Sequence, residues 1–252
     1  VGRLYNDTAE TFRAMAASID TATHHVNALY YQTSWDEYTA PFYEALERAV
    51  ARGVTVRLLV DHHGMRTIPG HKDFRRRLNA MGIEWHEMLP FAPLHGQIRR
   101  PDLRNHRKIL VIDGREAYVG SHNLVAPDYD TPSYAKAGML YDDTSVSVTG
   151  PIVAQIQAVF AVDWYYACKE ILTPEVLTPP AAEVAAEREE EQASAMQIIP
   201  SGPAFKDEPN LRAFVHMISS ARTHVSITSP YFIPDEALMT ALTNAALSGV
   251  EV

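Results

Sequence analysis

Residues 54–60, with the sequence Val-Thr-Val-Arg-Leu-Leu-Val, constrain the fold more than any other stretch of the chain. Such a nearly continuous apolar run is typical of a strand covered on both faces, whereas a half-exposed strand alternates apolar and polar side chains. Apolar residues at helical spacing precede and follow this run. We expect helices at residues 9–23, 41–52, 71–81 and 152–171, and further strands at 25–31, 83–86, 108–112, 117–120 and 144–149. This alternation predicts an α/β layered fold in which helices flank a central mixed β-sheet.

The balance of charges limits the possible partners. The chain has 31 acidic and 22 basic residues, and a formal charge of -9 argues against a protein that coats nucleic acid non-specifically. A basic collar interrupts this acidic character, and its members are Arg99, Arg100, Arg104, Arg107 and Lys108. We expect the collar to receive an anionic substrate. Cys168 is the only cysteine, which excludes a disulfide framework and a thiolate metal cage.

Residues 105–113 have the sequence Asn-His-Arg-Lys-Ile-Leu-Val-Ile-Asp, and within them residues 108–112 predict a short buried strand that ends in a turn at Asp113. Side chains on a strand alternate between its faces, so His106 and Lys108 are expected on the same side, about 7 Å apart. A nucleophile for phosphorus and a cation for the phosphoryl oxygens are what phosphodiester chemistry needs when no metal takes part. Taken alone, a His-x-Lys pair is more often two solvated residues at the end of a surface strand.

The wider pattern around this pair is more specific. The spacing His106-x-Lys108-x-x-x-x-Asp113, followed by Gly120-Ser121-x-Asn123, resembles the signature of the phospholipase D superfamily. Other segments resemble the bacterial cardiolipin synthase branch of that superfamily, and these are residues 56–61, 104–109, 163–165, 200–203 and 228–236. The resemblance implies a phospholipase D-like fold with two such motifs around one site. It also implies transfer of a phosphatidyl group from one phosphatidylglycerol to another, with release of glycerol and without metal or other cofactor.

The resemblance assigns a role to each residue of the motif. His106 would be the nucleophile that forms a phosphohistidine, or the acid/base partner if the two halves exchange roles. Lys108 would bind a phosphoryl oxygen, and Ser121 and Asn123 would donate neutral hydrogen bonds to the same group. Asp113 completes the catalytic motif by resemblance, although strand alternation places it opposite Lys108 and favours a structural role in the turn or in a cross-domain contact.

A carboxylate that orients the histidine is also implied by the resemblance. It lies seven residues before a Gly-Pro pair in the family, and Asp143 lies seven residues before Gly150-Pro151. The family commonly has a basic residue directly before this aspartate, whereas this chain has Asp142. Which of the two carboxylates faces His106 is therefore left open.

Several other side chains invite a functional interpretation. The adjacent pairs His24-His25 and His62-His63 point to opposite faces of a strand, so neither pair is expected to bind a metal. Four aromatic residues are expected at equivalent strand ends of two repeats. Core packing is the first expectation for them and an acyl-chain entrance is the alternative, and they are Tyr30, Tyr31, Tyr231 and Phe232.

An internal repeat divides the chain. Residues 19–26 return at 218–225, and residues 45–56 return at 241–252, with a loop difference of three residues. We expect a first phospholipase D-like domain at residues 1–172, an acidic linker rich in Pro, Glu and Ala at 173–196, and the start of a second, truncated domain at 197–252. A second His-x-Lys motif is expected beyond Val252 or from another chain, so the 252 residues alone are expected to bind phospholipid without turning it over.

The expected function is therefore phosphatidyl transfer of the cardiolipin synthase type. Its expected partners are anionic phospholipid, specifically phosphatidylglycerol, and the membrane surface, with no nucleic acid. The expected location is the bacterial cell membrane, with the catalytic part facing the cytoplasm and the spanning helices outside this chain. The rival is a phosphodiesterase of the same fold that hydrolyses phospholipid or nucleic acid, and a lipid-binding domain without catalysis is a third possibility.

Overall fold

The computed structural model describes residues 2–91, 102–129, 131–178, 194–202, 207–229 and 231–252. The chain forms two compact units, Val1–Gln197 and Ile198–Val252, which are described separately. Most of the expected linker lies outside the described residues.

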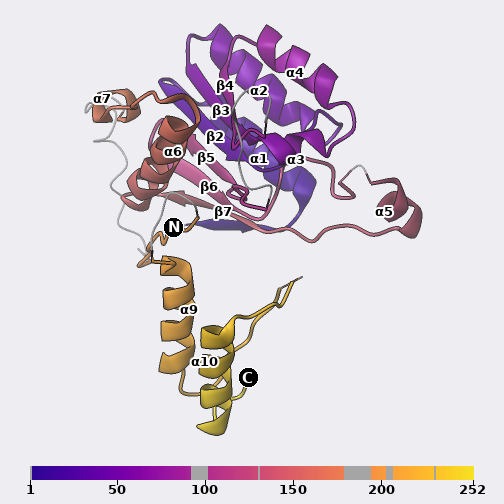
Figure 1. The fold of residues 1–252 in the computed structure, drawn as a ribbon. Coiled ribbons are helices and arrows are strands. Elements are labelled where there is room, and N and C mark those ends of the chain that lie inside the picture. Colours follow the sequence, from indigo (N-terminus) through magenta and orange to yellow (C-terminus); the bar gives the residue numbers. More distant parts are fainter. Residues whose placement is uncertain (1, 92–101, 130, 179–193, 203–206, 230) are drawn as a thin grey trace. The chain divides into compact units, whose positions relative to one another are not determined.

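A seven-stranded sheet forms the centre of the first unit, in the order β1-β7-β6-β5-β2-β3-β4 (Figure 1). The strands β2, β3 and β4 are parallel, and the other neighbours are antiparallel. The predicted mixed sheet is thus confirmed. The strands are β1 (Arg3–Tyr5), β2 (His25–Tyr30), β3 (Thr55–Asp61), β4 (Glu84–Met88), β5 (Ile109–Ile112), β6 (Glu116–Gly120) and β7 (Ser145–Thr149).

One face of this sheet is covered by the helices α1 (Thr8–Asp20), α2 (Ala40–Ala51) and α4 (His71–Ala80). Their apolar side chains form one buried cluster with alternate residues of β2, β3 and β5. Burial of these apolar surfaces is the dominant favourable contribution to folding. The cluster includes Phe12, Met15, Phe42, Leu46, Phe74, Val26, Leu58 and Leu110.

The helix α6 (Ile152–Cys168) contacts β2, β4, β5, β6 and β7 (Figure 1). It buries Phe160 and Trp164, and strand residues outside the first cluster, such as Leu59 and Val111, are also fully buried. Both faces of β3 are therefore covered, as its apolar run predicts. The helix ends at Cys168 because Lys169 adopts a left-handed conformation, three residues before the expected end.

Three short helices complete the described part of the first unit. They are α3 (His62–Arg66), directly after β3, α5 (Pro132–Ala137) between β6 and β7, and α7 (Pro174–Leu177). None of the helices in the described ranges combines the length and apolar content that a membrane span requires.

The second unit packs α9 (Pro209–Ser220) against α10 (Glu236–Leu247) around a small cluster that includes Ile218 and Leu242. A parallel bridge joins His224 to Glu251. The repeat noted in the sequence equates these two positions with His25 and Thr55, which also form a parallel pair. This correspondence supports the repeat, which stays a prediction.

Candidate active site

His106 lies in the irregular segment that leads into β5, and its side chain is exposed. The imidazole is stacked on the ring of Tyr31, with 3.7 Å between ring centroids and 20° between ring planes. Lys108 Nζ donates a hydrogen bond of 2.7 Å to the carbonyl oxygen of His106 and lies 5.7 Å from the centre of the Tyr31 ring. The structure therefore brings His106 and Lys108 together, as the strand alternation predicts.

The charge state of His106 suits a nucleophile. Burial lowers its pKa, the ammonium of Lys108 lowers it further, and the carboxylate of Asp61 opposes both effects. The pKa stays below its ordinary value, so the imidazole is neutral at neutral pH. A neutral imidazole keeps an in-plane lone pair for attack on phosphorus.

The residues that alternate with His106 and Lys108 anchor the segment to α6. Asn105 Nδ2 donates to Asp163 Oδ2 at 3.1 Å, and Arg107 Nη1 forms an ion pair with the same carboxylate at 2.7 Å. The side-chain oxygen of Asn105 also accepts a hydrogen bond of 3.0 Å from the backbone of Arg107. Asp163 is 3% exposed, so this clamp is held away from solvent, where such bonds are strongest.

Asp61 holds the other side of the same segment. It is the last residue of β3 and caps α3 by accepting hydrogen bonds from the backbone of His63 and Gly64. Its second oxygen accepts a bond of 3.2 Å from the backbone N–H of Asn105. Sequence reasoning assigned no role to Asp61 or Asp163, although the position of Asp61 at the carboxyl end of a parallel strand is a signal that was available.

The expected basic collar is wrong for two of its members. Arg104 has a side chain that is 6% exposed and lies 3.7 Å from Asp61, and Arg107 is neutralised by Asp163. Arg99 and Arg100 lie outside the described residues. Within the described residues 102–108, these arginines are used for internal ion pairs, and Lys108 carries the positive charge beside the histidine.

Asn123 and Asp143 are linked through a residue that sequence reasoning missed. Asn123 accepts a hydrogen bond from the backbone of Gln32 at 3.1 Å and donates one of 3.0 Å to the hydroxyl of Tyr129. That hydroxyl donates in turn to Asp143 Oδ2 at 3.3 Å. Tyr129 therefore connects the two predicted residues across the loop between β6 and β7.

Ser121 lies at the end of β6, beside the start of β7. Its hydroxyl accepts a hydrogen bond of 2.9 Å from the backbone N–H of Thr144, and its own N–H donates to the carbonyl oxygen of Thr144 at 2.8 Å. The hydroxyl also donates a long hydrogen bond of 3.4 Å to the carbonyl oxygen of Thr144, and because the side chain is exposed it can turn this proton toward a ligand.

The two adjoining carboxylates differ in their surroundings. Asp143 is half-buried, bonds to Tyr129 and raises the pKa of Lys108 by its charge, whereas Asp142 is exposed. Among the hydrogen bonds of the described residues, none joins either carboxylate to His106. Of the two carboxylates, Asp143 is therefore the one whose charge acts on Lys108.

Asp113 lies apart from these residues, at the far end of β5. Its carboxylate accepts hydrogen bonds of 2.8 Å from the backbone N–H groups of Thr23, His24 and His25, and one of 3.0 Å from the Thr23 hydroxyl. The contacts tie the turn after β5 to the start of β2. The structure thus does not bring Asp113 to His106.

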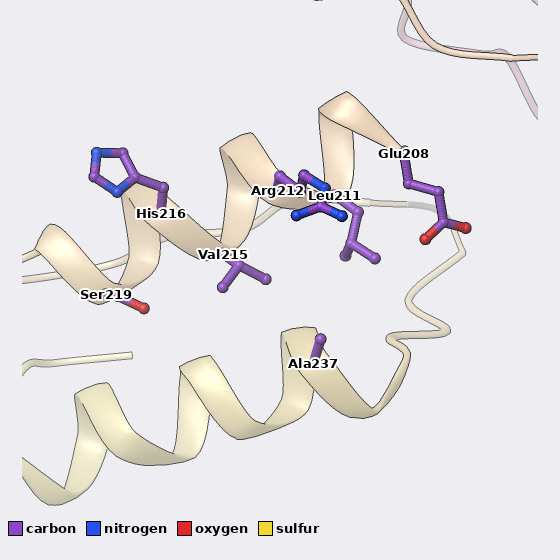
Figure 2. Close-up of a pocket in the computed structure, with 7 residues that line it drawn as sticks. All are labelled: Glu208, Leu211, Arg212, Val215, His216, Ser219 and Ala237. Atoms are coloured by element: carbon purple, nitrogen blue, oxygen red, sulfur yellow. The ribbon is translucent and has the colours of Figure 1, made fainter. Parts of the chain in front are cut away.

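Two histidines outside the motif have local partners. His25 bonds to Gln157 at 2.9 Å, and His62 pairs with Glu87. In the ranges that the structure describes, no group of three or more His, Cys, Asp or Glu side chains is placed to hold a metal ion. The second unit contains a pocket between α9 and α10 (Figure 2), which is lined by Glu208, Leu211, Arg212, Val215, His216, Ser219 and Ala237. It includes no residue of the motif.

The chain is similar to known proteins over most of its length. Residues 15–164 match the family model described as "Cardiolipin synthase, PLD-like domain". A cardiolipin synthase of Geobacillus thermodenitrificans (strain NG80-2) is 36% identical over 249 residues, which cover 96% of this chain and 46% of that protein. Cardiolipin synthase A of Pseudomonas aeruginosa (strain LESB58) is 34% identical over 254 residues, covering 99% of this chain and 48% of that protein. The chain thus spans about half the length of the curated relatives it matches.

Solved structures show the same fold at low sequence identity. Phosphatidylserine synthase of Haemophilus influenzae Rd KW20 has a TM-score of 0.65 and 12% identity, covering 99% of this chain and 60% of that one. Nuc of Salmonella typhimurium, a phospholipase D family member, has a TM-score of 0.50 and 15% identity, covering 66% of this chain and 95% of that one. By its family match and its curated relatives, the chain belongs to the phospholipase D-like domain family of the cardiolipin synthases.

Proposed function

We propose that the protein is a phosphatidyltransferase of the cardiolipin synthase type, which uses phosphatidylglycerol both as donor and as acceptor. The observation that carries the proposal is the pairing of a neutral, solvent-accessible imidazole at His106 with the ammonium of Lys108. The family of the chain supports the choice of phospholipid over other phosphodiesters.

The proposed reaction has two steps. A ring nitrogen of His106 attacks phosphorus, the bond from phosphorus to the glycerol oxygen breaks, and a general acid protonates the departing glycerol. The hydroxyl of a second phosphatidylglycerol then attacks the phosphohistidine and gives up its proton, while the phosphorus–nitrogen bond breaks. The histidine of a second motif is the natural acid and base for these protons. We propose that it comes from the part of the relatives that this chain does not cover, or from another copy of the chain.

The other predicted residues have roles that their contacts support. Lys108 exchanges its bond to the His106 carbonyl for a phosphoryl oxygen when substrate enters. Ser121 turns its hydroxyl proton to the same phosphoryl group. The side-chain amide of Asn123 donates one proton to Tyr129 and its second proton to the phosphoryl group. Asp143 acts on the site through its charge and through its hydrogen bond with Tyr129. We propose that it orients His106 when bound substrate brings the carboxylate and the imidazole closer together.

The proposed partner is the surface of a phospholipid membrane, and the proposed location is the cytoplasmic side of the bacterial cell membrane. Support comes from three exposed apolar side chains directly before the two carboxylates of the site. They are Met139, Leu140 and Tyr141, of which Leu140 is 69% exposed. Apolar and aromatic side chains of this kind enter the interface of a bilayer readily.

Product analysis tests this function. The enzyme used for this test, and for the kinetic tests below, is the protein that includes the proposed second motif. Incubated with phosphatidylglycerol vesicles, it is expected to sediment with them and to release glycerol and diphosphatidylglycerol in equal amounts. Phosphatidic acid as the main lipid product would indicate hydrolysis instead of transfer. Cleavage of DNA without any turnover of lipid would overturn the proposal.

The pH dependence of kcat/KM tests the role of Lys108. Burial lowers the pKa of its ammonium to about 8, against the opposing charge of Asp143. The positive charge is present below this value and is lost as the pH rises through it, so kcat/KM is expected to fall on the alkaline side near pH 8. Lys108→Arg is expected to remove this alkaline limb, because a guanidinium stays charged throughout the range. An unchanged limb in the variant would assign the titration to another group.

A further inference from the structure

Tyr31 and its neighbour Tyr30 lie in different surroundings. Tyr30, the last residue of β2, is 1% exposed and packs in the core, as expected for the aromatic strand ends. Tyr31 is half-buried and covers one face of the imidazole of His106. The expectation of core packing is therefore wrong for Tyr31, because its ring leaves the sheet at the edge where the histidine lies.

The backbone around Tyr31 is built to hold this ring in place. A Cβ atom on Gly64 would lie 2.1 Å from the carbonyl oxygen of Tyr31 and 2.9 Å from its ring atom Cδ2. Real Cβ atoms do not approach backbone this closely, so only glycine lets α3 pack directly on Tyr31. Asp61 fixes α3 in turn by capping it, and the same carboxylate binds the backbone of Asn105. One buried carboxylate is thus bonded both to the helix that packs on Tyr31 and to the residue directly before His106.

Stacking restrains the histidine without blocking its chemistry. The lone pairs of an imidazole lie in the plane of its ring, so a neighbour that covers the ring face leaves both nitrogens open at the ring edge. A phosphorus atom and an orienting carboxylate can then approach opposite edges. Contact over a whole face also limits rotation about the side-chain bonds of His106, which lowers the entropy lost when the nitrogen aligns with phosphorus.

The same ring faces the second member of the pair. Lys108 Nζ lies 5.7 Å from the centre of the Tyr31 ring, within the range in which the π face attracts a cation. The ring therefore interacts with both groups that the proposed reaction uses.

We propose that Tyr31 is a positioning residue, whose ring holds the imidazole of His106 in the orientation that attack on phosphorus requires. The inference rests on the proposed role of His106 as nucleophile. Because the stack depends on the aromatic ring and not on the hydroxyl, phenylalanine should replace tyrosine and alanine should not.

Three variants of the enzyme test the proposal: Tyr31→Ala, Tyr31→Phe and the matched control Tyr165→Ala, which removes an aromatic ring that is 42% exposed on α6. Tyr31→Ala is expected to lower kcat about 100-fold, the typical effect of a small misplacement of reacting groups, with KM changed less than about threefold. Tyr31→Phe and the control are expected to stay within about threefold of the wild type in both parameters.

A second measurement needs no substrate. Nuclear magnetic resonance of the His106 ring protons in the 252-residue chain reports the ring current of Tyr31, which Tyr31→Ala should abolish and Tyr31→Phe should keep. The pKa of His106, lowered chiefly by burial, should rise toward its ordinary value in Tyr31→Ala alone. Circular dichroism of each variant confirms that the fold is intact.

Each outcome decides one question. Wild-type kcat in Tyr31→Ala after loss of the ring-current shift would overturn the positioning role. Equal losses in Tyr31→Phe and Tyr31→Ala would also overturn it, by assigning the effect to the hydroxyl. If the wild-type enzyme turns over no phosphodiester, the proposed function fails. In that case an unchanged ring-current shift and an unchanged pKa of His106 in Tyr31→Ala would overturn the stacking as well.

Discussion

The variant His106→Ala is expected to lose phosphatidyl transfer, with kcat reduced about 10⁴-fold or more, the range found when a covalent nucleophile is removed. In the described residues, no other imidazole is stacked beside Lys108. No second histidine is therefore positioned to attack phosphorus when His106 is removed. The free energy of unfolding should change little, because the side chain is exposed and does not fill the core.

The matched control is His216→Ala, which removes an exposed imidazole from α9 in the second unit. It is expected to keep wild-type kcat. Brief reaction with labelled phosphatidylglycerol and acid-free isolation should trap a phosphohistidine in the wild type and in His216→Ala, but not in His106→Ala. Activity of His106→Ala near that of the wild type would refute the role of this residue.

Local sequence pattern was sufficient to predict most of the fold. The long apolar strands and the helices that alternate with them carry their own periodicity, and the structure contains them within a few residues of the expected bounds. The strand β1 (Arg3–Tyr5) was missed because three residues are too few to show a period, and its pairing with β7 is what makes it a strand. The helix α3 was missed because it depends on the cap from Asp61.

The site was predicted only where its residues are close in sequence. His106 and Lys108 are two residues apart, so strand alternation alone predicts that their side chains lie on the same side. The positions of Tyr31 and Asp61 beside them depend on the adjacent, parallel placement of β2 and β3, which local pattern does not give. The basic collar failed for the same reason, since local charge cannot show that Asp61 and Asp163 neutralise Arg104 and Arg107.

Asp113 shows how a motif residue can serve the fold instead of the chemistry. Burial by itself would raise the pKa of this carboxyl group, but hydrogen bonds from the backbone of Thr23, His25 and His24 and from the Thr23 hydroxyl outweigh it and hold the pKa below its ordinary value of 3.8. The residue also adopts a left-handed backbone conformation, with φ of 51°, which asparagine tolerates as well as aspartate. Replacing one by the other therefore tests the carboxylate without straining the turn.

Asp113→Asn is expected to lower the free energy of unfolding by about 3 kcal/mol or more, because an amide has one acceptor oxygen and leaves buried N–H groups without a partner. Urea denaturation measures this loss. The control Asp20→Asn, which weakens an exposed ion pair with Arg48, should cost less than about 1 kcal/mol. For the enzyme, kcat per folded molecule should stay near the wild-type value in both variants, and a stable Asp113→Asn protein with greatly reduced kcat would instead make the carboxylate catalytic.

Wild type and Asp113→Asn differ in the free energy of unfolding, and the pH dependence of that difference shows whether the negative charge of Asp113 contributes to it. The pKa of Asp113 is lower in the folded chain than its ordinary value of 3.8, so the folded state favours the ionised form. The stabilisation is then fully present well above pH 4 and is lost as the pH falls from the ordinary pKa through the folded one. Wild type and Asp113→Asn should accordingly differ most at neutral pH and converge in acid. A gap that stayed constant down to the lowest pH at which the wild type folds would show that the charge of Asp113 contributes nothing, and that its hydrogen bonds act by geometry alone.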